Sequence, residues 1–126
     1  MIKVYIASPY STGDQAINVR RQIDAANELL NAGFIPFVPL LTHFQHIVHP
    51  RSYEEWLDYD LELLIACDAV LRLDGQSNGA DIEVKTATKH QIPVFFALNH
   101  LKEYFTDEEF FYLDFDNFTN QTEYKA

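Results

Sequence analysis

The chain has 126 residues, 48% of them hydrophobic, and a formal net charge of -10. This length allows one ordinary domain with one core, so residues 1–126 are expected to form a single domain. With nine Lys and Arg residues and one cysteine, the chain lacks both a basic surface for nucleic acid polymers and a disulfide or cysteine-based zinc framework.

The first half of the chain has the pattern strand, helix, strand. Met1 runs straight into an apolar stretch, residues 2–7, which predicts a buried strand with neither a signal peptide nor a membrane-spanning segment. We therefore expect a cytoplasmic protein without a membrane partner. Apolar residues at helical spacing then predict a helix: Val19, Ile23, Ala26 and Leu30. Residues 34–38 predict a second strand, which should lie at a sheet edge because Pro36 interrupts it.

The second half repeats this alternation. Residues 40–51 show no periodicity and predict a long loop, after which Ser52 and Glu55 form a capping box that starts a second helix. Residues 68–73 predict a third strand, a third helix follows it, and residues 92–98 predict a fourth strand. This order predicts an α/β fold, a doubly wound and mainly parallel sheet of four to five strands with helices on both faces, like flavodoxin and Rossmann domains.

The pattern weakens in the C-terminal part, about residues 99–126. Thr106 and Glu109 fit a second capping box that could start a short helix. Six aromatic residues are too many for a solvated tail: Phe105, Phe110, Phe111, Tyr112, Phe115 and Phe118. This part should therefore cover a sheet edge or bury against another subunit, which predicts a homodimer or a higher homo-oligomer.

The turn Ser77-Asn78-Gly79 before the third helix is suited to an anion. Backbone N–H groups at a helix start have no partner within the helix, and the helix dipole favours negative charge there. A phosphate beside Ser77 and an ionised Glu83 in the first turn would both be stabilised, although the same residues also fit an ordinary N-cap followed by an exposed acid. Asp81 either repels a phosphate or is a capping acid turned to solvent.

A second acid, Asp60, lies on the apolar stripe of its helix. Acids are rarely buried unless they are paired, so Asp60 either bonds to a neighbour or lines a cavity. In an open parallel sheet, ligands bind at the carboxyl ends of the strands, where the loop after the first strand and the turn before Glu83 both emerge. Asp60 can join them only from the N-terminal part of its helix or if that helix crosses the cleft.

Two carboxyls in different environments are the equipment of glycosidic bond cleavage with retention. Glu83, ionised, suits the nucleophile, and Asp60, its pKa raised by burial, suits the proton donor. The hydroxyls of Tyr5, Ser8 and Tyr10 are candidates to orient the nucleophile or the sugar, but Tyr5 equally fits an ordinary core residue.

Three histidines, His43, His46 and His49, recur at every third residue of the predicted loop. No Cys or carboxylate lies among them, and a loop does not hold this spacing in a fixed geometry, so we expect substrate contact or loop packing rather than metal. Arg20 and Arg21 either belong to a solvated face or approach a phosphate.

Residues 2–97 resemble the nucleoside 2-deoxyribosyltransferase superfamily, which includes deoxynucleoside 5'-monophosphate N-glycosidases and an uncharacterised bacterial and phage branch. Three stretches show the resemblance: the first strand with its loop, residues 4–10; Asp60, eight residues before Asp68; and Ser77-x-Gly79-x-x-x-Glu83.

The resemblance implies a nucleophilic Glu83 that attacks C1' of the sugar, a Tyr5 that orients it, and an Asp60 that assists the departing base or holds the sugar. Ser8 and Ser77 would contact the 5' end. The implied substrate is a (deoxy)nucleoside or its 5'-monophosphate, with hydrolysis favoured over transfer and no cofactor. The expected substrate-binding residues are Ser8, Pro9, Tyr10, Arg20, His43, Ser77, Asn78 and Gly79. Two other functions stay open: a nucleotide-sensing module without turnover, and a glycohydrolase of an NAD-type dinucleotide.

Overall fold

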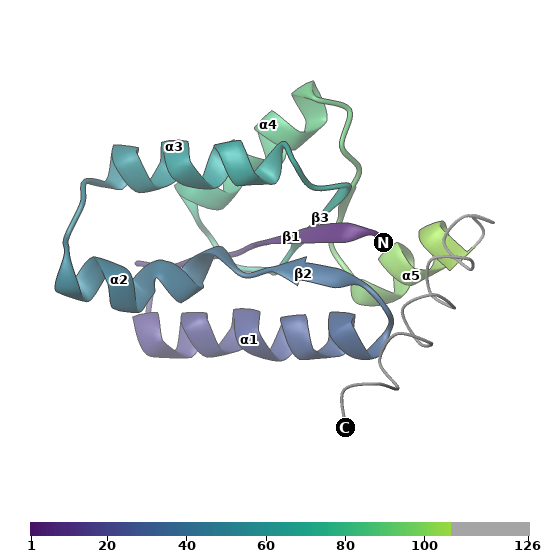
Figure 1. Cartoon of the computed structure of the whole chain (residues 1–126), viewed down its shortest axis with the longest axis horizontal. Coiled ribbons are helices and arrows are strands. Elements are labelled where there is room, and N and C mark those ends of the chain that lie inside the picture. The colour runs from purple at the N-terminus through teal and green to yellow at the C-terminus, as the bar shows by residue number, and fades with distance from the viewer. Residues whose placement is uncertain (107–126) are drawn as a thin grey trace.

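The computed structural model of the chain describes residues 1–106, which form a sheet with helices on both faces (Figure 1). The elements in chain order are β1 (Lys3–Ala7), α1 (Gln15–Asn31), β2 (Ile35–Phe37), the 3-10 helix η1 (Pro39–Leu41), α2 (Thr42–Val48), α3 (Tyr53–Leu64), β3 (Ala69–Arg72), α4 (Asn78–Lys89), β4 (Val94–Phe95) and α5 (Leu98–Thr106). Within these residues, no helix is both long enough and apolar enough to span a membrane.

The sheet has four strands in the order β2-β1-β3-β4, and every neighbouring pair is parallel. This order is that of flavodoxin-like domains and confirms the predicted doubly wound α/β fold. Strand β2 lies at an edge, as Pro36 predicts, and β4 is shorter than the predicted strand because α5 already begins at Leu98. The order of the chain reverses between β1 and β3, and ligands bind at such a switch point in open α/β sheets.

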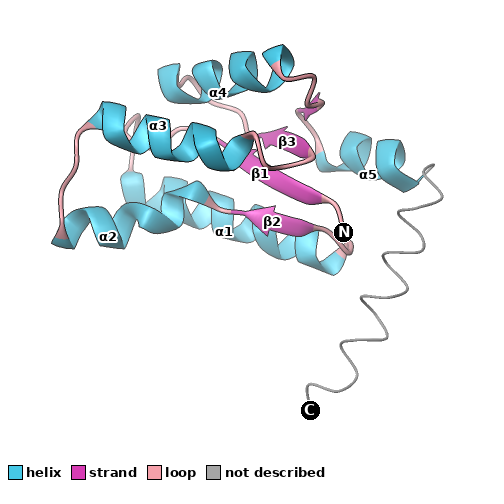
Figure 2. Cartoon of the chain, turned by 45° about the horizontal axis from the view of Figure 1, so that its top comes forward, coloured by secondary structure: helices cyan, strands magenta, loops and turns pink. Residues whose placement is uncertain are grey.

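Alternate residues of the central strands face two separate cores, one on each side of the sheet (Figure 2). Val4 and Ile6 of β1 pack toward α1 and α5, where the core also holds Leu29 and Leu101. The opposite core, toward α3 and α4, holds Tyr5, Ala7, Leu64, Val70, Ala80 and Ala87. Tyr5 is therefore buried in the same layer as the helix that carries Glu83.

The buried face of α1 differs from the predicted one. Val19 and Ala26 are buried, but Ile23 and Leu30 are exposed. Their places on the buried face are taken by Asn18, Gln22 and Leu29. Asn18 explains the difference, because its amide donates to two loop carbonyls, at 2.8 and 2.9 Å, and a polar residue bonded in this way is missed by a pattern of apolar positions.

The predicted loop at residues 40–51 is mostly helical, which corrects that prediction. Most of it forms η1 and the seven-residue helix α2. Helix α2 has no side-chain cap at its start and none of its residues is buried, so the usual sequence signals of a helix are absent.

The helices predicted to begin after Ser52 and after Ser77 begin where expected. The Ser52 hydroxyl accepts the backbone N–H of Glu55 at 3.1 Å, and the Ser77 hydroxyl accepts that of Ala80 at 3.1 Å. These bonds fix the first turns of α3 and α4, the two helices that carry the predicted acids.

Helix α5 was not predicted. Thr106 belongs to this helix and is the last described residue, and the rest of the predicted capping box lies outside the described residues. Phe105 is buried against Phe34 and Phe95, so the first of the six named aromatics belongs to the core beside α1. The other aromatics named above, from Phe110 to Phe118, lie outside the described residues.

Candidate active site

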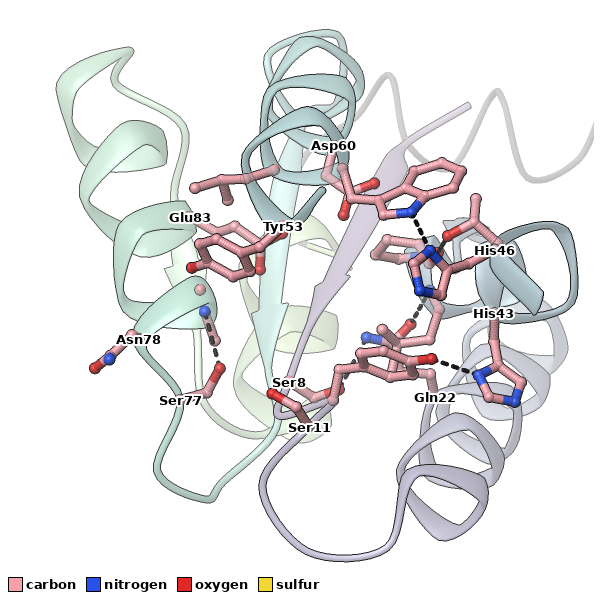
Figure 3. Close-up of a pocket in the computed structure, with 18 of the residues that line it drawn as sticks. Ser8, Ser11, Gln22, His43, His46, Tyr53, Asp60, Ser77, Asn78 and Glu83 are labelled. Carbon is pink, nitrogen blue, oxygen red and sulfur yellow. Dashed lines mark hydrogen bonds between the residues drawn. The ribbon is translucent and has the colours of Figure 1, made fainter. Parts of the chain in front are cut away.

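A pocket of about 540 Å³ opens at the carboxyl ends of β1 and β3, at the switch point of the sheet. It brings together most of the predicted site residues: Ser8, Tyr10, His43, Asp60, Ser77, Asn78, Gly79 and Glu83. Figure 3 shows Ser77, Asn78 and Glu83 on one side of it and His43 and His46 on the other.

Three predicted residues do not line the pocket. Tyr5 lies behind Glu83 and bonds to it. Pro9 packs against the loop after β3, and Arg20 is 82% exposed and pairs with Asp24 at 3.7 Å. Of the two predictions for Arg20, the one that placed it on a solvated face agrees with the structure. Pro9 contacts the loop after β3 without lining the pocket.

Glu83 is buried, with 7% of its surface exposed, and sits in the second turn of α4. The Tyr5 hydroxyl donates a hydrogen bond to its Oε2. The pKa of Glu83 is raised to about 8, mainly by burial; the Tyr5 bond and the Arg72 guanidinium oppose this rise, and the charge of Asp60 adds to it. The expectation of a fully ionised Glu83 in the first turn is therefore wrong, since the acid of that turn is Asp81.

Asp60 reaches the pocket because α3 crosses it. Tyr53, Trp56, Leu57 and Asp60 follow one another at helical spacing, and all four line the pocket, so the predicted apolar stripe is largely a pocket wall. Among residues 1–106, the buried Oδ1 of Asp60 has no hydrogen-bond partner. Burial raises the pKa of Asp60 to about 7.

The carboxyls of Glu83 and Asp60 form a coupled pair. Each raised pKa has burial as its largest cause, and two charges in this poorly solvated place would repel each other. The pair therefore holds one proton near neutral pH. The higher pKa of Glu83 places this proton mainly on Glu83, while the Tyr5 bond and Arg72 stabilise the arrangement in which Glu83 is charged and Asp60 is protonated.

The start of α4 forms the edge of the pocket that the sequence predicts to bind an anion. Ser77 uses its hydroxyl to cap Ala80, while the N–H groups of Asn78 and Gly79 belong to the first turn and have no acceptor within the helix. Asp81 is 63% exposed, pairs with Arg72 at 3.5 Å and does not line the pocket. The capping alternative for Asp81 matches this placement.

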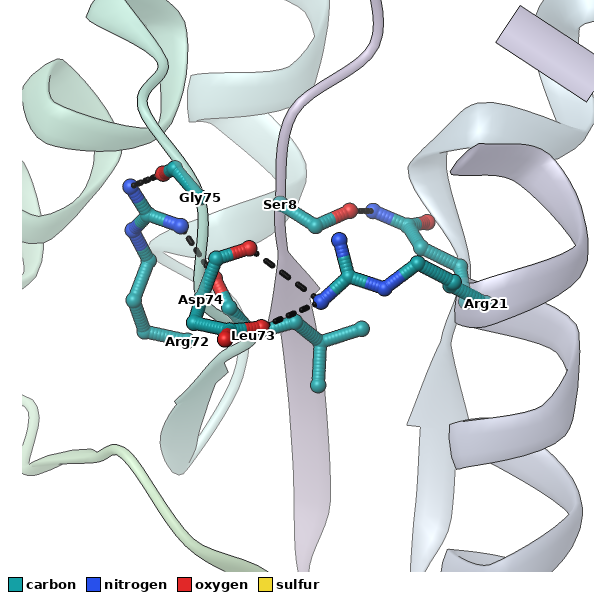
Figure 4. A network of polar contacts seen from close by, with 7 residues as sticks. Ser8, Arg21, Arg72, Leu73, Asp74 and Gly75 are labelled. Carbon is teal, nitrogen blue, oxygen red and sulfur yellow. Dashed lines mark hydrogen bonds and ion pairs between the residues drawn. The ribbon is translucent and has the colours of Figure 1, made fainter. Parts of the chain in front are cut away.

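Two arginines hold the loop between β3 and α4 (Figure 4). Arg72 donates to the carbonyls of Leu73 and Gly75, and Arg21 donates to the Asp74 carboxylate at 2.6 Å. Gly75 has φ +116°, and an added Cβ would lie 2.8 Å from the Pro9 ring. The loop that delivers Ser77 is therefore fixed by contacts with both α1 and the loop after β1.

The side chain of Gln22 links the end of β1 to the segment before α2 by three hydrogen bonds. Its Nε2 donates to the Ile6 carbonyl at 3.0 Å and to the Ser8 hydroxyl at 2.8 Å, and its Oε1 accepts the Leu40 N–H at 3.2 Å. One buried amide thus connects the end of β1 to the segment that enters α2.

The side of the pocket opposite Glu83 is built from rings. The Tyr10 hydroxyl and His43 Nδ1 are 2.5 Å apart, and Trp56 Nε1 donates to His46 Nδ1 at 2.8 Å. Burial raises the pKa of Tyr10, so its hydroxyl keeps its proton near neutral pH. In the part of the chain that the structure describes, no group of three or more His, Cys, Asp or Glu side chains is placed to hold a metal ion.

Several pocket residues were missed from the sequence: Gln22, Arg51, Tyr53 and Trp56. Tyr53 and Trp56 lie at helical spacing on the same stripe of α3 as Asp60, so this spacing could have predicted that they line the pocket. Arg72, which lies behind Glu83, ends a strand next to the ligand-binding edge, and a buried arginine there needs a partner. Gln22 carried no such signal, since its role depends on backbone groups far away in sequence.

Comparisons with known proteins identify a family and a similar fold. Residues 2–97 match a family whose description is a domain of unknown function (DUF7768). A solved 2-deoxyribosyltransferase from the psychrotolerant bacterium Bacillus psychrosaccharolyticus has a similar fold, with a TM-score of 0.54 and 22% identity over 73% of this chain and 69% of that chain. No curated protein matches the chain.

Proposed function

The chain belongs to the DUF7768 family, and we propose that it cleaves or transfers the N-glycosidic bond of a (deoxy)nucleoside or its 5'-monophosphate. One observation carries this proposal: two carboxyls of raised pKa, the buried Glu83 and the half-buried Asp60, line one pocket, and the Tyr5 hydroxyl is bonded to Glu83. The similar fold of a 2-deoxyribosyltransferase supports it.

In the first step, a carboxylate oxygen of Glu83 attacks C1' of the sugar. The C1'–N bond breaks, its electron pair goes to the base nitrogen, and the Asp60 carboxyl gives that nitrogen its proton. The products of this step are a free base, a glycosyl ester on Glu83 and an Asp60 carboxylate. Tyr5 holds the attacking carboxylate in place, because its hydroxyl bonds to the other oxygen.

In the second step, Asp60 acts as a base. A water molecule gives it a proton and attacks C1', and the ester bond breaks so that Glu83 becomes a carboxylate again. If a second nucleobase attacks in place of water, its N–H proton goes to Asp60 and a new nucleoside forms. Two displacements at C1' retain its configuration.

The anion-binding edge suits the 5' end of the substrate. The N–H groups of Asn78 and Gly79 and the dipole of α4 stabilise a phosphate, while the Ser8 hydroxyl, which accepts from Gln22, can donate to the sugar. Because Asp81 pairs with Arg72 outside the pocket, its charge is partly compensated before a phosphate arrives.

Incubation of the protein with pooled nucleosides, 5'-monophosphates and NAD, followed by chromatography of the free bases, tests the proposal. Release of a purine or pyrimidine base, abolished in Glu83→Gln, is the expected result. Nicotinamide as the only released base would instead indicate a dinucleotide glycohydrolase. Tight nucleotide binding by calorimetry without any release would indicate a sensing module.

A further inference from the structure

His46 lies in the pocket with one ring nitrogen fully engaged by the protein. Its Nδ1 accepts the indole N–H of Trp56 at 2.8 Å and lies 3.2 Å from the backbone N–H of Arg51, which also donates to it. Two donors point at this nitrogen, so it carries no hydrogen itself. The ring hydrogen is therefore on Nε2.

The Nε2 edge of His46 is left for a ligand. Residues 1–106 provide no hydrogen-bond partner for this nitrogen, although the residue lines the pocket. The Trp56 indole cannot donate to the ligand, because its single N–H is used by His46. This side of the pocket thus offers an aromatic surface with one N–H donor of fixed direction.

The position of this donor follows from α3. In the proposed reaction, Asp60 stands beside the base nitrogen that leaves C1'. Trp56 precedes Asp60 by four residues, about 6 Å along the same face of the helix, and His46 is bonded to Trp56. A base that starts at Asp60 therefore extends along Trp56, and its far edge meets His46.

We infer that His46 determines base specificity: its Nε2–H donates to an acceptor on the far edge of the nucleobase, a carbonyl oxygen or an unprotonated ring nitrogen, while the ring of the base lies against Trp56. This inference deepens the proposed function and rests on it for the identity of the ligand. A base that presents only a donor at this edge would leave two hydrogens facing each other and would be rejected.

Two substitutions separate the two nitrogens of His46. An asparagine amide places its oxygen near the position of Nδ1 and keeps the acceptor for Trp56, but it offers nothing near Nε2. A glutamine amide reaches the position of Nε2 and keeps the donor, but it gives up the bond to Trp56. Because Trp56 is the only tryptophan of the chain, its fluorescence reports whether that bond survives.

Calorimetry in the Glu83→Gln background measures binding without turnover. The probes are the four common deoxynucleoside 5'-monophosphates and 2-deoxyribose 5-phosphate, which lacks a base. We expect His46→Asn to weaken the best-bound nucleotide by about tenfold, with unchanged tryptophan emission and unchanged binding of the sugar phosphate. His46→Gln should bind that nucleotide within about threefold of the parent, with a shifted emission.

Equal nucleotide affinities in the parent and His46→Asn proteins would overturn the inference. Equal losses in both variants, or a loss for the sugar phosphate as large as that for the nucleotide, would also overturn it, because His46 would then only support the pocket. These outcomes differ from failure of the proposed function, in which nucleotides bind but the wild-type protein releases no base.

Discussion

The two walls of the pocket are built in opposite ways. The carboxyl wall consists of Asp60 on α3 and Glu83 on α4, with Tyr5 of β1 behind Glu83. It adjoins a core in which Tyr5 is fully buried. The histidine wall, His43 and His46, stands on α2, which has no buried residue. The proposed chemistry thus has a rigid support, and the proposed recognition of the base has a lightly packed one.

The outer surface of α2 sharpens this contrast. Phe44, Ile47 and Val48 are 65%, 61% and 69% exposed, so this helix turns its apolar side to solvent and its histidines to the pocket. Few buried contacts mean that local opening of α2 costs less than opening of the sheet. Just before α2, the buried amide of Gln22 accepts a hydrogen bond from the backbone N–H of Leu40.

The largest effect is expected at the carboxyl wall. Glu83→Gln removes the nucleophile and should lower base release by on the order of 10³-fold or more. Chromatography of free bases measures this loss, and a thermal unfolding curve shows whether the fold persists. Asp81→Asn is the matched control, because Asp81 is an acid of the same helix outside the pocket, and it should keep most of the activity. Equal losses in both variants would contradict the role of Glu83.

Asp60→Asn should lower base release by roughly 10²–10³-fold, because the departing base loses its proton donor. Asp58→Asn, on the exposed side of the same helix, should have no such effect. The test is sharpest with bases that leave poorly as anions. If these bases are released as fast as good leaving groups by the variant, Asp60 is not the donor.

The pH profile of Asp60→Asn gives an independent signature. In the wild type, activity needs Glu83 charged and Asp60 protonated, so kcat/KM should fall below about pH 7 and above about pH 8. In the variant there is no Asp60 proton to lose and no Asp60 charge to raise the pKa of Glu83. The alkaline fall should therefore disappear, and a single acid fall should remain at the pKa that Glu83 has without the charge of Asp60.

The carboxyl wall should also cost the protein stability at high pH. The pKa of Glu83 is about 8 in the folded chain and 4.5 in the unfolded chain. Between these pH values the folded state holds a proton on Glu83 that the unfolded state has lost, so the free energy of unfolding falls as the pH rises from 4.5 to 8. Glu83→Gln removes this loss and should stabilise the protein at pH 9 by about 2–4 kcal/mol, with a difference that shrinks toward pH 5. Denaturant unfolding at both pH values measures it. A constant difference would contradict the raised pKa.

A smaller effect is expected where the loop after β3 meets the loop after β1. Gly75→Ala should destabilise the protein by about 1–3 kcal/mol, because a Cβ at φ +116° is strained and meets the Pro9 ring. Gly13→Ala provides the matched control, since Gly13 has φ +84° but nothing within 4 Å of the added atom. Thermal unfolding should show the smaller loss for Gly13→Ala, and equal losses would mean that Pro9 moves aside.

The smallest effect is expected on the histidine wall. Phe44→Ser should change the free energy of unfolding by less than about 0.5 kcal/mol, whereas Leu64→Ala, in the core beside the carboxyl wall, should cost about 2–5 kcal/mol. Denaturant unfolding compares the two. A large loss for Phe44→Ser would show that the exposed side of α2 is covered in solution, and the contrast between the walls would then be wrong.

Sequence reasoning recovered the parts of the molecule that depend on local pattern. The alternation of strands and helices, the edge position of β2 and the caps Ser52 and Ser77 all follow from short-range rules. Asp60 stood out because it occupies an apolar stripe, and Glu83 because it follows the turn at a helix start; the structure places both at one pocket.

The missed parts depend on contacts between distant segments. Helix α2 has neither a cap nor a buried stripe, so nothing local marks it. Gln22 and Asn18 are buried because they satisfy backbone groups of other segments, which no periodicity shows. The pKa of Glu83 was misjudged for the same reason, since the helix start was visible in the sequence and the burial was not.

Pro36 affects how readily the edge strand β2 can pair with a strand from another molecule. The N–H of Ile35 bonds inward to the Ile2 carbonyl, so the next position along the strand turns its nitrogen toward the open side. Pro36 occupies that position and has no hydrogen to offer. Among residues 1–106, the outer edge of β2 therefore offers one donor fewer to a strand from another molecule, which disfavours pairing at this edge.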